Sequence, residues 1–449
     1  MTTRASTLII PVENQCRELD AKLLLSCIAA ERGFPVVLGS RTFIHFEIAS
    51  IPRGVYLAKS MRSLSERMFD IFRKLGHDIV AWDEEGLVRM PDAYYWERRL
   101  SPKTSEKLAA LIAWGPDDAR AFREYPGHAG APIYITGNSR GDVMRRELRG
   151  YYSAEVAAIR ERFGNFILIN TNFGWSNHFL PSFNQTGADV SDEFMAQLID
   201  NRAAVFESFK RMIPTLAASL PEHTILIRPH PIESHAPWNE IAKDFKNVAV
   251  ANEGNVIPWL LACDALIHNS CTTAVEGFIL DRPVLAYAPE KMDHFDDELP
   301  NALSTRVSSV DELVSALREI LAGNTSVPDL EQKRKRLENH IAALDGPLAS
   351  ERIVEVLEGL GYAERPPQRS GVGPYLMGSA HTKLRTAVKR FNMRREGHRN
   401  SIEYHDHRFP EITVDDLRKK VDRLGRELNR FDRIQIRRRS DHIFEINCG

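Results

Sequence analysis

The sequence of 449 residues is poor in cysteine and has no long apolar run. Its five cysteines form no CxxC pair, which indicates neither a structural zinc nor a disulfide framework. No apolar stretch approaches the ~18–20 residues that span a bilayer, and Met1–Ser6 leads into a short strand-like run instead of a signal sequence. We therefore expect a cytoplasmic protein.

Several catalytic signatures are missing as well. The chain has no GxxxxGKS or GxxxxGKT and no GxGxxG after its first apolar run. These absences exclude P-loop chemistry and argue against a dinucleotide enzyme. The histidines have no firm zinc spacing, and we interpret residues 405–407 (HDH) as a polar loop. We expect neither a metal nor a cofactor.

Charge is unevenly distributed along the chain. Residues 362–449 hold 20 Lys and Arg against 12 Asp and Glu, whereas residues 1–361 hold 39 against 49. A basic tail on an acidic body commonly indicates an anionic surface as partner. No zinc-finger spacing or RNP-like aromatic signature accompanies this charge, so we do not expect nucleic acid to be that partner.

Short apolar runs alternate with segments of helical spacing through most of the chain. Thr7–Val12 predicts a buried strand, and Arg17–Arg32 predicts a helix that ends at Gly33. A second series begins at Phe166–Asn170, and a long helix is predicted over Asp192–Ser219. This alternation indicates an α/β fold of parallel sheets covered by helices. Further strands are predicted over Val36–Leu38, Gly54–Leu57, Asp78–Trp82, Ala109–Trp114, Pro132–Thr136, Thr224–Ile227, Val248–Val250, Ala265–His268 and Val284–Ala286.

The order of these elements predicts two doubly wound, Rossmann-like domains, over residues 1–150 and 151–361. Such sheets bind ligands at the C-terminal ends of their strands, so we expect a cleft where the two domains face each other. Residues 362–449 are expected to form a basic C-terminal extension that begins with a Pro- and Gly-rich linker. Within it, Thr413–Phe431 predicts a helix and Arg433–Ile446 a final strand.

Three consecutive carboxylates, Asp83, Glu84 and Glu85, follow the predicted strand Asp78–Trp82 and precede Gly86. Their mutual repulsion predicts a raised pKa for one of them. A carboxylate at the end of a strand can deprotonate an acceptor hydroxyl. The alternative interpretation is an acidic surface turn.

The segment RPHP, residues 228–231, follows the predicted strand Thr224–Ile227. Its two prolines hold the backbone stiffly around Arg228 and His230, which suits the presentation of cationic donors to a phosphate. His230 can protonate or hydrogen-bond a departing phosphate oxygen, because imidazole titrates near neutrality. The alternative is a proline-rich turn with a capping histidine.

The segment HNSCTTAVEG, residues 268–277, runs from a predicted strand into a predicted helix. Ser270, Thr272 and Thr273 fall in the expected first turn, where hydroxyls and backbone N–H groups can bind an anion. Ser270 also fits a plain N-cap. Glu276, about one turn further, is placed to reach a ribose hydroxyl. We interpret Cys271 as a packing residue, because no base adjoins it.

Taken in order, these three motifs resemble those of bacterial GT-B glycosyltransferases that use CMP-activated sugars, the sialyltransferases and Kdo transferases. The chain also resembles bacterial surface carbohydrate biosynthesis proteins over roughly residues 7–350. The segments that carry this resemblance are RELDAKLLL (17–25), WDEEGLV (82–88), TNFG (171–174), RPHP and HNSCTTAVEG, with an extension beyond that range into RFPEIT (408–413). The resemblance implies a GT-B fold and metal-independent, inverting transfer of Kdo or a related nonulosonic acid from a CMP-sugar donor to a glycan or lipid-linked glycan acceptor.

The same resemblance implies roles for individual residues. Glu84 and Glu85, with Asp83 as a third candidate, become the general base, and His230 assists the departure of the CMP phosphate. The intervening Cys271 departs from a strict Ser-Ser or Ser-Thr pair, which leaves open which hydroxyl holds that phosphate. The expected donor-binding residues are Gly86, Arg228, Pro231, Asn269, Ser270, Thr272, Thr273 and Glu276.

Three alternative functions stay open at this point. The first is a GT-B enzyme that uses a UDP-sugar, including a 2-epimerase-like enzyme, and the second is a polyol-phosphate transferase. The third is a non-catalytic scaffold of a polysaccharide assembly complex. The presence of all three motifs argues against the scaffold.

In the extension, apolar residues from Leu376 to Phe391 recur at helical spacing among lysines and arginines. One interpretation is a solvated helix that packs on the body by one face. The other is an amphipathic helix that docks the protein peripherally on the anionic inner face of the membrane.

Overall fold

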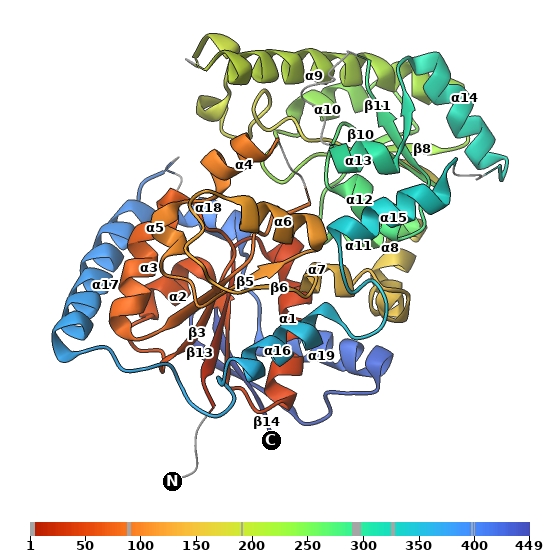
Figure 1. Cartoon of the computed structure of the whole chain (residues 1–449). Coiled ribbons are helices and arrows are strands. Elements are labelled where there is room, and N and C mark those ends of the chain that lie inside the picture. Colours follow the sequence, from red (N-terminus) through yellow and green to blue (C-terminus); the bar gives the residue numbers. More distant parts are fainter. Residues whose placement is uncertain are drawn as a thin grey trace. The chain divides into compact units, whose positions relative to one another are not determined.

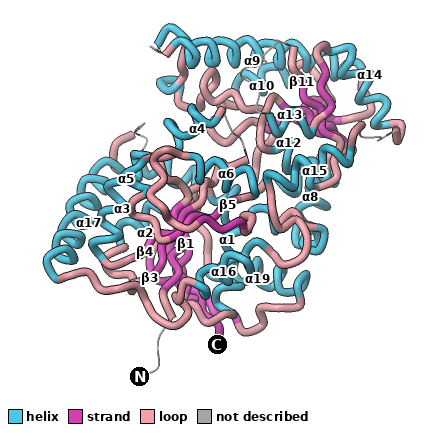
Figure 2. Tube along the Cα trace, viewed as in Figure 1, coloured by secondary structure: helices cyan, strands magenta, loops and turns pink. Residues whose placement is uncertain are grey.

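The computed structural model describes residues 5–87, 91–189, 192–289, 298–324, 328–396, 398 and 400–449. These residues form two compact units, each with its own β-sheet (Figure 1 and Figure 2). The first unit holds Met1–Gly86, Pro91–Tyr151 and Glu338–Gly449, and the second is built mainly from Tyr152–Leu337. None of the described helices is both long and apolar enough to cross a membrane.

An eight-stranded sheet forms the centre of the first unit, in the order β13-β14-β2-β1-β3-β4-β5-β6. Strands β1 to β6 are parallel. Every residue of β1, β2 and β3 is buried, as expected for the apolar runs of a parallel sheet with both faces covered. The strands are β1 (Thr7–Val12), β2 (Val36–Ser40), β3 (Gly54–Ala58), β4 (Asp78–Ala81), β5 (Ala110–Ala113), β6 (Ile133–Ile135), β13 (Ile434–Ser440) and β14 (Ile443–Cys448).

Helix α1 (Gln15–Glu31) occupies a central position in the first unit. It contacts β1, β2, β14 and the helices α7, α16 and α19, and it is buried from Glu18 to Ala30. Since all its sides are covered, the charged residues of its first turns must find partners inside the protein. The other helices are α2 (Arg41–Glu47), η1 (Ser63–Ser65), α3 (Glu66–Leu75), α4 (Asp92–Arg99), α5 (Pro102–Ser105), α6 (Pro116–Glu124), α7 (Ser139–Asp142), η2 (Arg146–Tyr152), α16 (Ala349–Gly359), α17 (Val372–Met393), α18 (Ile402–Arg408) and α19 (Val414–Leu428).

The residues expected to form a separate extension complete the sheet of the first unit. Strands β13 and β14 form a hairpin, and β14 pairs antiparallel with β2, for example Phe444 with Leu38. Gly39 permits this approach, because a Cβ there would clash with the backbone oxygen of His442. The prediction of a single final strand is wrong, because a turn at residues 441 and 442 reverses the chain. The first unit thus continues from Glu338 to Gly449, across the boundary expected at residue 361.

A six-stranded parallel sheet forms the centre of the second unit, in the order β12-β11-β10-β7-β8-β9. Helix α9 (Glu193–Ser219) begins one residue after the predicted start, Asp192. The Asp192 side chain caps the helix by accepting a hydrogen bond from the backbone N–H of Met195 at 2.9 Å. The strands are β7 (Phe166–Asn170), β8 (Thr224–Arg228), β9 (Val248–Val250), β10 (Ala265–His268), β11 (Val284–Tyr287) and β12 (Thr305–Val307). The other helices are α8 (Ser153–Phe163), η3 (Pro181–Phe183), η4 (Gly187–Asp189), α10 (Ala236–Ala242), α11 (Val256–Ala262), α12 (Thr273–Ile279), α13 (Glu298–Leu303), α14 (Val310–Leu321) and α15 (Leu330–His340).

Each unit buries a hydrophobic core of its own. The core of the first unit includes Tyr56 and Phe72, and that of the second includes Phe173, Phe209 and Trp238. Separate cores are characteristic of distinct domains.

Candidate functional site

In the sheet of the second unit, the chain runs from β7 to strands on one side and later returns to strands on the other side of β7. We call this place, between β7 and β10, the divergence point. The chain passes from β7 to β8 and β9 on one side, and then crosses to β10 on the other side of β7. Open α/β sheets bind ligands at the C-terminal ends of the strands at such a point. Asn170, Arg228 and His268 end β7, β8 and β10 and are neighbours in register. The segments TNFG, RPHP and HNSCTTAVEG therefore begin side by side at this edge.

A buried carboxylate, Glu233, ties two of these segments together. Its Oε1 accepts hydrogen bonds from the Thr171 hydroxyl and the Phe173 backbone N–H, both at 2.9 Å, and from the His230 backbone N–H at 3.2 Å. Sequence reasoning missed this residue, although an acidic side chain three positions after His230 in a Pro-rich segment was a visible signal. Glu233 thus fixes the backbone of the RPHP turn relative to TNFG.

Burial raises the pKa of Glu233 to about 6, and its hydrogen bonds only partly offset that effect. The folded state binds this proton more tightly than the unfolded chain, so the group contributes stability at low pH that is lost as pH rises through 6. In the wild type we expect this group to lower the free energy of unfolding by about 2 kcal/mol between pH 4 and pH 7. The Glu233→Gln variant, which cannot titrate at this position, should not show this decrease.

Denaturant unfolding of wild type and variant across this pH range measures the effect. The exposed Glu222, in the same unit, provides the control substitution Glu222→Gln. If the free energy of unfolding depends on pH in the same way for wild type and Glu233→Gln, Glu233 does not have the raised pKa.

His230 is half-buried, and its ring is oriented by the backbone. The ring Nδ1 accepts a hydrogen bond from the Ile232 backbone N–H at 3.3 Å. Because Nδ1 is an acceptor, the neutral ring carries its proton on Nε2, which can donate to a phosphate oxygen. Pro229 and Pro231 flank the histidine and restrict the backbone on both sides.

Arg228 is directed away from the RPHP turn. Its Nη2 donates to the Gly254 carbonyl oxygen at 2.8 Å, and its guanidinium carbon lies 5.9 Å from the centre of the Trp259 ring. These contacts attach the end of β8 to the loop that follows β9. These contacts position that loop, and the predicted contact of Arg228 with phosphate stays a prediction.

His268 belongs to the core of the second unit. Its Nε2 lies 2.8 Å from the Ser304 hydroxyl, which itself donates to the Pro300 carbonyl oxygen. Burial lowers the pKa of His268 to about 3, so the ring is neutral at physiological pH. The neighbouring Cys271 is also buried, which raises the pKa of its thiol to about 11 and agrees with a packing role.

The helix after β10 begins later than the sequence predicted. Helix α12 starts at Thr273, with Thr272 at the N-cap position and no side-chain cap. Ser270 has a left-handed backbone, with φ of 50°, and its Oγ accepts a hydrogen bond from Asn301 Nδ2 at 2.7 Å. The N-cap interpretation of Ser270 is therefore wrong, because this turn places it before the helix. Glu276, expected to face a ribose, is buried within α12.

Two asparagines at the divergence point are buried but have amide atoms without hydrogen-bond partners among the described residues. These atoms are Oδ1 of Asn170 and both Oδ1 and Nδ2 of Asn269. Asn170 is only 3% exposed and Asn269 only 4%. An unsatisfied buried polar group costs ~1–3 kcal/mol, so such atoms commonly meet a ligand or water. Asn269 was predicted as a binding residue. Asn170 was missed, although a polar residue at the end of the apolar run FILIN marks it.

The first unit has a divergence point of its own, between β1 and β3. The carboxylates after β4 lie in this unit, and each is held by a different cation. Arg99, from α4, binds Asp83 through its Nε at 2.9 Å. Arg17, from α1, binds both carboxylate oxygens of Glu85 at 3.1 and 3.2 Å.

The third carboxylate, Glu84, has partners for only one of its two oxygens among the described residues. Its Oε2 accepts a hydrogen bond from Trp82 Nε1 at 3.0 Å and lies 3.3 Å from Lys22 Nζ. Its Oε1 is buried and has no hydrogen-bond partner among the residues that the structure describes. Glu84 therefore keeps one oxygen that can accept a proton from a hydroxyl.

The segment RELDAKLLL explains how these charges are stabilised. Besides Arg17 it supplies Lys22, which donates to the Pro11 carbonyl oxygen at 2.8 Å and to Glu18 at 2.7 Å. Burial alone would raise the pKa of Glu18, but Lys22 and Lys59 hold it well below its usual range. Sequence reasoning noted this segment but did not assign it a role; the Glu–Lys spacing of four residues on a buried helix was the signal.

The expected repulsion within the acidic run does not raise the pKa of Glu85. Arg17 lowers the pKa of Glu85 to about 2, against the opposing effect of burial. Of the three carboxylates, Glu85 is therefore not the one with the predicted raised pKa, because it faces the guanidinium of Arg17. Gly86 has a packing role: a Cβ there would come within 2.6 Å of Cδ1 of Trp114.

One set of side chains among the described residues has metal-ligand geometry. Donor atoms of His405, Asp406 and His442 lie within 4.8 Å of one another. Both ring nitrogens of His405 already have partners, Ser40 Oγ and Asp406 Oδ1, each at 2.9 Å. We interpret the cluster as a connection between α18, β2 and the turn of the hairpin.

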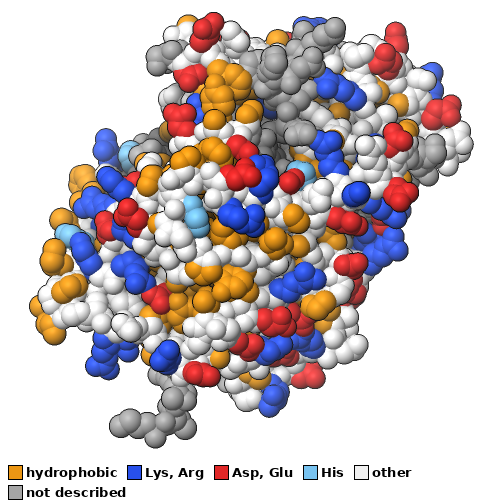
Figure 3. Space-filling view, viewed as in Figure 1, with side chains coloured by type: hydrophobic (Ala, Val, Ile, Leu, Met, Phe, Trp, Pro, Cys, Tyr) orange, Lys and Arg blue, Asp and Glu red, His pale blue; other side chains and the backbone are white. Residues whose placement is uncertain are grey.

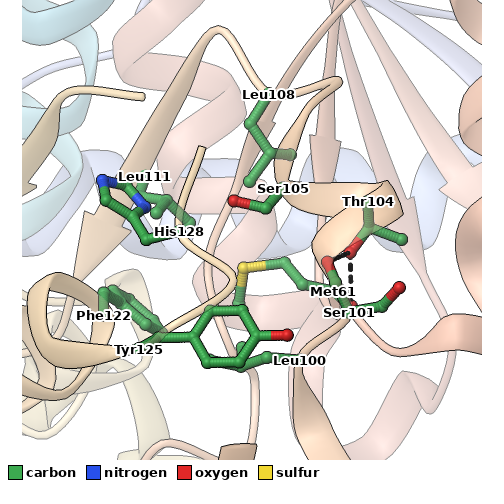
Figure 4. A pocket seen from close by; sticks show the side chains of 10 residues that line it. All are labelled: Met61, Leu100, Ser101, Thr104, Ser105, Leu108, Leu111, Phe122, Tyr125 and His128. Atoms are coloured by element: carbon green, nitrogen blue, oxygen red, sulfur yellow. Dashed lines mark hydrogen bonds between the residues drawn. The ribbon is translucent and has the colours of Figure 1, made fainter. Parts of the chain in front are cut away.

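A small apolar pocket lies elsewhere in the first unit, between β5, α5 and α6 (Figure 4). It encloses about 10 Å³, room for about one water molecule and far too little for a nucleotide. Figure 4 shows the Thr104 hydroxyl bonded within the protein, to the Ser101 carbonyl oxygen at 2.9 Å. The pocket is a packing gap. Its lining residues are Met61, Leu100, Ser101, Thr104, Ser105, Leu108, Leu111, Phe122, Tyr125 and His128.

Comparison with known families gives one match. Residues 207–359 match the family model of CDP-glycerol:poly(glycerophosphate) glycerophosphotransferase, about a third of the chain. The matched region contains RPHP, Glu233 and HNSCTTAVEG. No curated protein matches the chain.

Among solved structures, the chain is similar to the wall teichoic acid polymerase TagF in a structure with CDPG. The two share 13% identity over 79% of this chain and 88% of that chain, with a TM-score of 0.51. A UDP-N-acetylglucosamine 2-epimerase is similar at 12% identity, over 82% of this chain and 99% of that chain, with a TM-score of 0.52. These likenesses confirm the predicted fold class, GT-B with two Rossmann-like domains.

Proposed function

We propose that this protein transfers a polyol phosphate from a CDP-activated donor to a hydroxyl of a cell-surface polymer. The observation that supports the proposal most is the family match over residues 207–359, which includes RPHP and HNSCTTAVEG, two of the three segments at the divergence point of the second unit. The match favours the polyol-phosphate alternative over transfer of Kdo from a CMP-sugar, for which the comparisons give no support.

The reaction has three chemical events. The acceptor oxygen forms a bond to the phosphorus that carries the polyol, and the bond from that phosphorus to the oxygen of CMP breaks. The proton of the acceptor hydroxyl passes to a base. In our proposal His230 donates from Nε2 to the phosphate oxygen of the departing CMP. Asn170 and Asn269 bind polar groups of the donor, and Glu84 accepts the proton of the acceptor hydroxyl.

A donor panel tests the proposal. The purified full chain is incubated with CDP-glycerol, CDP-ribitol, CMP-Kdo or UDP-N-acetylglucosamine, with and without a poly(glycerol phosphate) acceptor, and nucleotide release is measured. We expect CMP release from a CDP-polyol that increases when the acceptor is added. Release from CMP-Kdo alone would restore the CMP-sugar interpretation, and UDP release alone would favour a UDP-sugar enzyme. No release from any donor would support the scaffold.

We propose separately from the reaction that the protein associates peripherally with an anionic membrane surface. A polymer that grows on a lipid carrier holds its acceptor end near the membrane, where a bound enzyme meets it at high local concentration. The surface suited to this association lies on α17.

A further inference from the structure

Helix α17 carries an exposed apolar stripe. Leu376, Leu384 and Phe391 are 62%, 59% and 67% exposed, and the small Ala380 and Ala387 between them are exposed as well. Of the twelve exposed large hydrophobic side chains among the described residues, seven lie on this one helix. Such a concentration is unusual for a protein surface that contacts only water. The seven are Val372, Tyr375, Leu376, Met377, Leu384, Val388 and Phe391.

The opposite face of α17 attaches the helix to the first unit. Gly378 and Thr382 are buried in it, and the helix packs against α3 and α2. A Cβ at Gly378 would come within 3.0 Å of the Lys74 Cβ and 3.2 Å of the Leu75 Cγ, so the two helices are in close contact there. The helix therefore packs on the body by one face, as the first of the two interpretations from the sequence expected, and this face is not the apolar stripe. The helix packs by its small residues and presents its large apolar ones.

The charges on α17 all have one sign. The helix has no acidic residue, and the exposed Lys383 and Arg390 lie beside the stripe, followed by Arg394 and Arg395 at its end. Figure 3 shows hydrophobic and basic side chains interspersed along the left edge of the molecule, where Figure 1 places α17. Arg385 and Lys389 lie on the packed side, where both lower the pKa of the buried His45 after the larger effect of burial.

We infer that α17 docks the first unit on an anionic lipid surface, with Leu376, Leu384 and Phe391 inserted among the acyl chains near the headgroups. A helix that presents large apolar side chains flanked by Lys and Arg, with no acidic residue, matches the interface of an anionic bilayer. Each basic residue near such a surface contributes attraction, and the apolar stripe adds hydrophobic burial. This docking goes beyond the transfer reaction and does not depend on it.

Vesicle sedimentation with the full chain and no substrate tests the docking. We expect the protein to bind vesicles of phosphatidylcholine with phosphatidylglycerol, to bind phosphatidylcholine alone much more weakly, and to be released as salt rises. The double variant Arg390→Gln/Arg394→Gln should bind about 25-fold more weakly, at about fivefold for each lost charge. The double variant Leu384→Ser/Phe391→Ser should bind the vesicles at least tenfold more weakly, and this factor should change little with salt concentration.

Helix α15 provides matched controls, because it exposes both an apolar and a basic residue in the second unit. Leu330→Ser and Lys335→Gln remove these side chains and should leave vesicle binding unchanged. Circular dichroism checks the folding of every variant. Equal binding by wild type and both double variants would overturn the inference. So would a wild-type chain that stays off vesicles and instead self-associates, or binds a protein partner, through the same stripe. Because no donor is present, failure here leaves the proposed reaction intact, and failure of the donor panel leaves the docking intact.

Discussion

Replacement of His230 by alanine is expected to lower turnover about 10²- to 10³-fold while changing the free energy of unfolding by less than about 1 kcal/mol. The ring is half-buried and its hydrogen bond with the Ile232 N–H, at 3.3 Å, is long. The backbone of the turn is held instead by Glu233, Pro229 and Pro231, which remain. The loss should therefore fall on the chemical step, in which departing CMP no longer receives a hydrogen bond from Nε2.

The control for this variant is His223→Ala, at the other end of the same strand. His223 precedes β8 at its N-terminal end, whereas His230 follows it at the C-terminal end, where parallel sheets bind ligands. Steady-state release of CMP from the best donor of the panel measures both variants. Turnover of His230→Ala at the level of His223→Ala would remove His230 from the mechanism.

Much of the sheet architecture could be predicted because buried parallel strands are continuous apolar runs. Thr7–Val12, Val248–Val250 and Ala265–His268 were predicted with the bounds that the structure gives them. Motifs that follow such strands can then be assigned to one edge of a sheet. For the second unit this reasoning correctly brought RPHP and HNSCTTAVEG to the same edge.

Long-range pairings were not available from the sequence. The pairing of β14 with β2 joins residues some 400 positions apart, and only the small size of Gly39 hints that another backbone approaches there. Likewise, the acidic run after β4 showed three carboxylates but not their cations, since Arg17 lies 68 positions from Glu85. The folded structure lowers the pKa of Glu85 through Arg17, an effect that the local sequence does not reveal.

These cation pairings rank the three base candidates, and Glu84→Gln is expected to show the largest loss of transfer. Asp83 and Glu85 are each bound by an arginine, and the pKa of Glu85 at about 2 makes it a weak base. Glu84 alone has a buried oxygen with no partner among the described residues. We expect acceptor-dependent turnover of Glu84→Gln to fall about 10²- to 10⁴-fold, the range typical for the loss of a general base.

The fold should tolerate this change. Glutamine keeps the size of the side chain and an oxygen that can accept the hydrogen bond from Trp82 Nε1, while Lys22 keeps Glu18 and the Pro11 carbonyl oxygen as partners. A destabilisation of about 1–3 kcal/mol is expected, from the loss of one buried charge interaction. Nucleotide binding, measured by calorimetry with CMP, should stay near the wild-type value, since the motifs proposed to bind the donor lie in the second unit.

Glu85→Gln provides the sharpest comparison, because the same substitution is made one residue further along the chain. Its carboxylate is occupied by Arg17, so we expect less than a tenfold change in turnover. If Glu85→Gln abolishes transfer and Glu84→Gln does not, the base is Glu85 and Arg17 must release it during the reaction. If both variants and Asp83→Asn transfer at the normal rate, the acidic run has only a structural role. Its buried ion pairs with α1 and α4 would then serve to hold the strand ends of the first unit, and the base would have to lie elsewhere.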